Sequence, residues 1–147
     1  MALDVGTKTC GVALSDPMGW TAQPHTTLRY AGEHDMSIFE NLFALFGEKE
    51  VTTVVIGLPL NMNGTEGPQS KKVRFFIHRL QKYLARQELD PDTINWIYRD
   101  ERLSSMGAER TLLEADISRT KRKQVIDKMA AVFILQGYLE ELENQSV

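Results

Sequence analysis

The chain has 147 residues, of which 42% are hydrophobic and 25% charged, and its formal net charge is −3. These values are those of an ordinary globular protein, so we expect one domain over residues 1–147 that needs no disulfide for its stability. No apolar run approaches the roughly 18 residues of a membrane span, and no leader resembles a signal peptide, so we expect a cytoplasmic protein without a membrane partner.

The first thirty residues predict an antiparallel arrangement of strands. Two short apolar runs, at 3–5 and 10–14, are joined by the turn-rich segment Gly6-Thr7-Lys8-Thr9, which favours a hairpin. A third strand is expected at about 22–28. Pro24 confines this strand to a sheet edge or lies at its start, because proline has no N–H to donate to a strand partner.

Helices and strands alternate in the rest of the chain. The β-branched run Val51–Ile56 predicts a strand that is covered on both faces. The other predicted elements are a helix ending near Gly47, a helix with an apolar stripe from Val73 to Leu84, a strand at 94–98, a helix beginning near Ser104 or Ser105, and a helix at about 124–142. This order predicts an α/β fold, with a mixed five-stranded sheet and helices on both of its faces.

Three acidic residues lie where a plain apolar core would not place them. Asp4 interrupts the first strand, Glu101 follows the strand at 94–98, and Asp127 lies on the apolar face of the last helix. Ligands of α/β sheets gather at the carboxyl ends of parallel strands, which is where Glu101 is expected. Three carboxylates held close together need a cation, and an all-oxygen donor set suits Mg²⁺ or Mn²⁺.

Each acid also has a structural interpretation, which the spacing alone leaves open. Asp4 could pair with a buried cation or cap a turn, and Glu101 could form a surface salt bridge with Arg99 or Arg102. Asp127 could complement the dipole at the start of its helix.

Positive charge is concentrated in two segments despite the negative net charge. One contains Arg119, Lys121, Arg122 and Lys123 within five residues, and the other runs from Lys71 to Arg86. Each segment is typical of a solvated face, and together they are compatible with a nucleic-acid backbone as partner.

Four ordered segments carry a resemblance to a known family. The segments "LDVGTKTCGVALSD", "VVIGLPLNMNGTEGP", "DERLSS" and "VIDKMAAVFILQGYLE" resemble the signature segments of the YqgF family, also called RuvX. Members of this family are RuvC-like proteins of the RNase H-like fold, described as Holliday junction resolvases and as pre-16S rRNA nucleases. The resemblance spans most of the chain, from Leu3 to about Glu140.

The resemblance implies a metal-dependent nuclease that hydrolyses a phosphodiester bond during maturation of the 5′ end of 16S rRNA. The expected partners are the pre-rRNA and a pre-ribosomal particle, and the expected state is a monomer or weak homodimer. The resemblance carries the family's metal-binding acids onto Asp4, Glu101 and Asp127, with Mg²⁺ or Mn²⁺ as cofactor. It also implies a nucleic-acid groove lined by the residues Thr7, Lys8, Asn61, Asn63 and Arg102. The charge of the basic run, independently of the resemblance, predicts Arg119, Lys121, Arg122 and Lys123 as further nucleic-acid contacts. Asp100 is expected to point away from the metals, because neighbouring strand residues face opposite sides.

Three other functions remain open at this point. A junction resolvase acting on four-way DNA would use the same fold and chemistry, and a catalytically silent nucleic-acid-binding module would keep the fold alone. The segment "DVGT" also resembles the phosphate loop of actin-like ATPases, but these need two such domains, and 147 residues supply one.

Overall fold

The computed structural model describes residues 1–102 and 118–145, and within the last helix it leaves the side chains of residues 119, 120 and 122–128 undescribed. The elements in chain order are β1 (Ala2–Val5), β2 (Thr9–Ser15), β3 (Ala22–Arg29), α1 (Ser37–Glu48), β4 (Thr53–Leu58), α2 (Pro68–Arg86), the 3₁₀ turn η1 (Pro91–Thr93), β5 (Asn95–Asp100) and α4 (Arg119–Gln145). The helix predicted near Ser104 lies outside the described residues.

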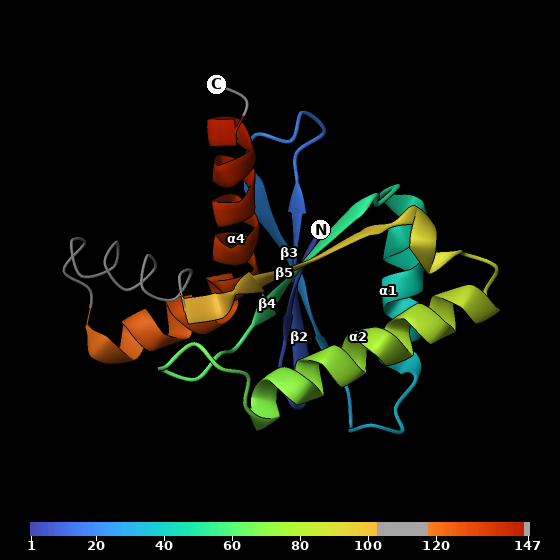
Figure 1. The fold of residues 1–147 in the computed structure, drawn as a ribbon, viewed down its shortest axis with the longest axis horizontal. Helices are drawn as coiled ribbons and strands as arrows, with labels where there is room; N and C mark the ends of the chain where they lie inside the picture. Colours follow the sequence, from blue (N-terminus) through green and yellow to red (C-terminus); the bar gives the residue numbers. More distant parts are fainter. Residues whose placement is uncertain (103–117, 146–147) are drawn as a thin grey trace.

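The strands form one mixed five-stranded sheet in the order β3-β2-β1-β4-β5. The pairs β1–β2 and β2–β3 are antiparallel, whereas β1–β4 and β4–β5 are parallel. Helices α1 and α2 lie on one side of the sheet and α4 on the other (Figure 1). The predicted α/β class, with a mixed sheet covered on both faces, is therefore confirmed.

Strand β3 lies at the edge that Pro24 predicted. Pro24 pairs with Ala13, next to a shift of register between Val12 and Ala13, so the missing N–H falls at an irregular point of the ladder. Strand β4 is the strongly buried strand that its β-branched composition predicted, and every residue from Val54 to Leu58 is buried.

Alternation along the strands divides the core into two layers. Large side chains such as Leu3 and Ile56 face α1 and α2, where they pack with Phe39 and other apolar residues. The other face carries smaller residues, including Ala2 and Ala13, and packs against α4. Small side chains allow a helix to lie close to the sheet, and this is the face to which Asp4 belongs.

The boundaries of several elements differ from the prediction, and β5 for example extends to Asp100 rather than ending at residue 98. Strand β4 begins at Thr53 rather than Val51, because the amide of Val51 donates to the Phe46 carbonyl and still belongs to the end of α1. Helix α4 begins at Arg119, five residues before the predicted start at 124. Among the described residues, no helix is both long and apolar enough to cross a membrane.

Candidate active site

The parallel strands bring three distant segments to one edge of the sheet. Strands β1, β4 and β5 run in the same direction, so their carboxyl ends meet at this edge. Asp4 lies near the end of β1, the loop of residues 59–67 follows β4, and Glu101 follows β5 directly. This edge is where α/β folds build their ligand sites.

The carboxyl groups of Asp4 and Glu101 share a hydrogen bond. Burial, together with this hydrogen bond and the negative charge of Asp4, raises the pKa of Glu101 from its ordinary value of 4.5 to about 8. The pair therefore retains a proton between its oxygens at neutral pH. The two arginines considered above as partners of Glu101 bind elsewhere, Arg99 to Glu141 at 3.0 Å and Arg102 to Asp100 at 2.8 Å.

A glycine on the intervening strand leaves the space for this contact. Strand β4 lies between β1 and β5, and a Cβ on Gly57 would lie 3.6 Å from Cγ of Glu101 and 2.5 Å from Cδ1 of Ile134 in α4. Any larger residue at this position would compete with the Glu101 side chain or with α4. The missing side chain of Gly57 thus opens the path from β5 across β4 to Asp4.

Helix α4 packs against the sheet beside Asp4. A Cβ on Gly11 of β2 would lie 3.6 Å from Cβ of Asp4 and 3.7 Å from Cβ of Ala131. Position 127 precedes Ala131 by four residues, so both positions share one face of α4. The side chain of Asp127 itself is not among those described.

The donor chemistry of the described pair fits a hard divalent cation. Within the side chains that the structure describes, no group of three His, Cys, Asp or Glu residues could hold a metal, and the acids that contact each other at this edge are the pair Asp4 and Glu101. Both supply only carboxylate oxygens, the donors that Mg²⁺ and Mn²⁺ prefer. A cation can also replace the proton that the pair retains.

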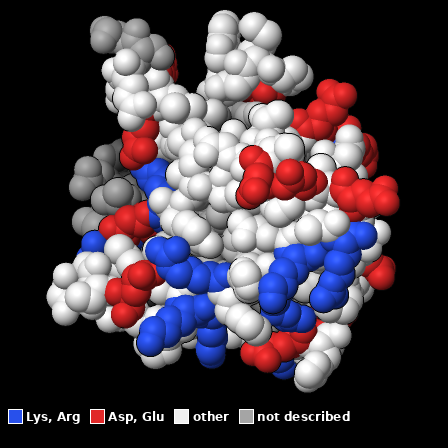
Figure 2. Space-filling model, turned by 45° about the vertical axis from the view of Figure 1, so that its right-hand side comes forward, with Lys and Arg blue, Asp and Glu red and all other residues white. Residues whose placement is uncertain are grey.

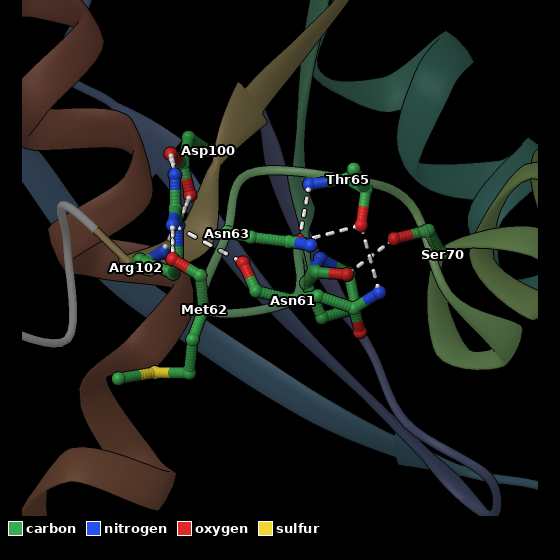
Figure 3. Close-up of polar contacts among 8 residues, drawn as sticks. Asn61, Met62, Asn63, Thr65, Ser70, Asp100 and Arg102 are labelled. Carbon is green, nitrogen blue, oxygen red and sulfur yellow. Dashed lines mark hydrogen bonds and ion pairs between the residues drawn. The ribbon is translucent and has the colours of Figure 1, made fainter.

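Asp100 and Glu101 contact different partners, Arg102 and Asp4 respectively. Asp100 accepts from Arg102 through the backbone N–H at 3.0 Å and through the guanidinium, with Nη2 at 2.8 Å (Figure 3). These contacts hold the pKa of the Asp100 carboxyl below its usual value. The remaining nitrogen, Nη1 of Arg102, donates to the carbonyls of Asn61 and Met62 at 3.1 and 3.0 Å. We call this arrangement of Asp100, Arg102 and the two carbonyls the Arg102 clamp.

Hydrogen bonds between side chains also connect residues within the loop of residues 59–67. Nδ2 of Asn61 donates to Oγ1 of Thr65 at 3.0 Å, and Oγ1 of Thr65 donates to Oδ1 of Asn63 at 2.6 Å (Figure 3). Gly64 supplies the left-handed backbone of the turn, with φ of 84°. The hydroxyl of Ser70 in α2 donates to the Pro59 carbonyl. The side chains of Asn61 and Asn63 thus shape the loop, and the loop is fixed beside the acids.

The other predicted nucleic-acid contacts are at the β1–β2 turn and at the start of α4. Thr7 and Lys8 are exposed on the β1–β2 turn, at the same edge as Asp4. Lys121 is exposed at the start of α4, whereas the side chains of Arg119, Arg122 and Lys123 are not described. All three histidines, His25, His34 and His78, are exposed.

Three positioning residues were missed by the reasoning from sequence. Gly11 and Gly57 lie in strand interiors, where glycine marks a close approach, and this signal was available. Asp100 was interpreted only as the acid that faces away from the metals, although it anchors the Arg102 clamp.

The order of the sheet and the paired carboxylates at its carboxyl edge are those of the RNase H-like class of α/β proteins. A family model described as "RuvX: Holliday junction resolvase" matches residues 1–141, and the chain belongs to this family. A protein of Halalkalibacterium halodurans named "Putative pre-16S rRNA nuclease" is 49% identical over 140 residues, which cover 95% of this chain and 94% of that protein. A protein of the same name from Bacillus thuringiensis is 51% identical and covers 95% of this chain and 96% of its own length.

Proposed function

We propose that this protein is a metal-dependent nuclease that hydrolyses a phosphodiester bond in the maturing 5′ end of 16S rRNA. The observation that carries the proposal is the Asp4–Glu101 carboxyl pair, half-buried at the sheet edge where the parallel strands end. The names of the two relatives support a ribosomal RNA substrate.

Asp4, Glu101 and Asp127 would hold Mg²⁺ or Mn²⁺ in this proposal. Such ions activate water and stabilise the leaving oxygen in phosphodiester hydrolysis. Asp4 and Glu101 contribute the oxygen ligands that are described, and Glu101 must lose its proton when it binds a cation. Position 127 shares the α4 face of Ala131, which supports Asp127 as the third ligand.

The protein's own residues would position the substrate around this centre. The exposed Thr7 and Lys8 offer a hydroxyl and a cation on one side of the acids. On the other side, the Arg102 clamp holds the loop of residues 59–67 at a fixed distance from Glu101, because Asp100 and Glu101 are neighbours in the chain. A rigid groove of this kind lowers the entropic cost of placing a phosphodiester bond next to the metal ligands.

The family description favours a second candidate, a resolvase of four-way DNA junctions. Both reactions use the same carboxylates and differ in the nucleic acid that is recognised.

We place the protein in the cytoplasm, acting on pre-ribosomal RNA as a monomer or weak homodimer.

The test is cleavage of a 5′-extended 16S rRNA precursor fragment and of a four-way DNA junction by the purified protein with Mg²⁺ or Mn²⁺. Asp4→Asn is the disabling variant, and Asp92→Asn is its matched control, because Asp92 is exposed in η1 at the opposite end of β5. A chelator provides the metal-free arm.

We expect RNA cleavage by the wild type and by Asp92→Asn, and its loss in Asp4→Asn and in chelator. Cleavage of the DNA junction but not of the RNA would show that the protein is a junction resolvase instead. Full activity of Asp4→Asn would assign the cleavage to another site or to a contaminant. Binding of RNA without cleavage under every metal condition would support the silent module.

A further inference from the structure

The outer face of α2 is strongly basic and contains one aromatic residue. Lysine and arginine side chains gather over the lower part of the face shown in Figure 2, where α2 runs. Lys71, Lys72 and Lys82 are exposed on this helix. Phe75 lies among them with 51% of its surface exposed, while its neighbours Val73 and Phe76 are buried in the core. Phe75 therefore presents an aromatic ring beside cations on the surface of α2.

A cavity of about 210 Å³ opens beside Phe75. Its walls come from the β1–β2 turn, the segment after β3 and α2, and they include the residues Gly6, Thr7, Tyr30, Lys72, Phe75 and Arg79. The cavity therefore combines aromatic surface with positive charge. Glu33 also lies at this cavity, so cations outnumber anions in its lining by two to one.

Arg79 supports the aromatic wall of the cavity. Its guanidinium lies 5.2 Å from the ring centroid of Phe39 and 5.7 Å from that of Phe75, and it donates to the backbone carbonyl of Glu33. These contacts tie the segment after β3 to α2. Tyr30 is also fixed, because its hydroxyl donates to the Gly6 carbonyl and its ring centroid lies 5.8 Å from that of Phe76 in α2. The lining of the cavity is thus held by contacts within the protein.

The cavity lies on the α1 and α2 side of the sheet, opposite the face to which Asp4 belongs, and it reaches the edge of the sheet at which β1 ends. Its residues Val5, Gly6 and Thr7 follow Asp4 in the chain. Three residues span at most about 11 Å, so the cavity begins within that distance of the metal-ligand candidate. A nucleic-acid strand that crosses the Thr7–Lys8 turn from Asp4 would reach it.

We propose that this cavity binds an unpaired base of the RNA substrate, with the base against the Phe75 ring and an adjacent phosphate at Lys72. This inference rests on the proposed nuclease function and extends it to a substrate class, RNA with a single-stranded segment next to the cleaved bond. Aromatic side chains next to cations are the means by which proteins bind single strands, since every base has a face that can stack. A paired base is stacked within its duplex and could not enter.

The experiment measures binding rather than cleavage and uses the full chain carrying Asp4→Asn, in chelator. The probes are a single-stranded RNA with one 2-aminopurine and the same RNA annealed to its complement. Phe75→Ala should weaken single-strand binding about 5- to 150-fold, the range found for one stacked base, and should abolish the change in 2-aminopurine fluorescence. Phe75→Tyr should retain both, and duplex binding should change little.

Two control variants address the loss of an aromatic ring and the loss of a charge. Trp20→Ala removes a ring that is 73% exposed on the β2–β3 turn, at the opposite end of the sheet. Lys49→Ala removes an exposed lysine next to the end of α1, also away from the acids. Lys72→Ala should reduce the salt dependence of binding by about 0.7 in the log–log slope, and Lys49→Ala should not.

The proposal is overturned if Phe75→Ala binds single strands as well as the parent, if it weakens single strands and duplex equally, or if Trp20→Ala causes the same loss. It is also overturned if the parent binds no RNA. Thermal unfolding of each variant shows whether a loss of RNA binding arises from misfolding. If Phe75→Ala is misfolded, Phe75→Tyr tests the proposal instead, because it keeps an aromatic ring and should retain single-strand binding. Phe75-dependent binding without cleavage by the wild type would reject the nuclease alone, whereas cleavage with Phe75-independent binding would reject the cavity alone.

Discussion

The carboxyl groups of Asp4 and Glu101 share a hydrogen bond although one lies in the first strand and the other follows the last. The contact passes over Gly57, on the strand that separates them.

The metal-free protein should lose stability as the pH rises. The pKa of Glu101 is about 8 in the folded state, mainly because of burial, and 4.5 is its ordinary value. Between these values the folded protein binds more protons than the unfolded chain, so its free energy of unfolding falls as the pH increases from 4.5 to about 8. Urea unfolding in chelator at pH 5, 6.5 and 8 measures this change.

Glu101→Gln is the control for this titration, because an amide cannot lose the proton. The difference in stability between the wild type and the variant should change over this pH range, and added Mg²⁺ or Mn²⁺ should stabilise the wild type most at the upper end. Parallel pH profiles of the two proteins would contradict the assignment of a raised pKa to Glu101.

Arg102→Lys should make the loop of residues 59–67 less ordered, because the Arg102 clamp loses hydrogen bonds. A lysine ammonium cannot bind the Asp100 carboxylate in two places and also donate to two carbonyls. If the loop positions RNA, kcat for cleavage should fall by about 10- to 100-fold, and hydrogen exchange in the loop should accelerate. Arg86→Lys, in the exposed last turn of α2, is the matched control. Unchanged exchange in Arg102→Lys would show that the clamp does not order the loop.

Gly57→Ala should destabilise the protein by about 1–3 kcal/mol, the usual cost of overpacking a core. The new methyl group would lie 2.5 Å from Cδ1 of Ile134, which is completely buried and has little room to move. Gly47→Ala is the opposite case, since no atom lies within 4 Å of its added Cβ and alanine favours a helix. The midpoint of chemical denaturation should therefore fall in Gly57→Ala and rise in Gly47→Ala. Equal midpoints in the two variants would indicate that α4 moves away to make room for the methyl group at position 57.

Replacement of Arg119, Lys121, Arg122 and Lys123 by glutamine should weaken RNA binding and flatten its salt dependence. Each lost contact with a single-stranded phosphate should reduce the log–log slope by about 0.7. Binding titrations at several salt concentrations measure this slope, with Lys49→Gln as the control. An unchanged slope would remove this basic run from the RNA interface.

Local patterns in the sequence were sufficient to predict the architecture. The β-branched run predicted the buried strand β4, Pro24 predicted the edge position of β3, and helical spacing predicted α1 and α2. These features depend on neighbouring residues, whose backbone preferences and alternation are visible in the chain itself. The sequence also singled out Asp4 and Glu101 as acids in unexpected places.

Only the tertiary structure determined which side chains meet. Strand order places β4 between the two acids, and the absent side chain of Gly57 allows Glu101 to reach Asp4. Packing similarly assigns Asp100 to Arg102 and turns an exposed phenylalanine, Phe75, into the wall of a cavity. The geometry of these contacts depends on how strands align and helices pack, which the local sequence pattern does not specify.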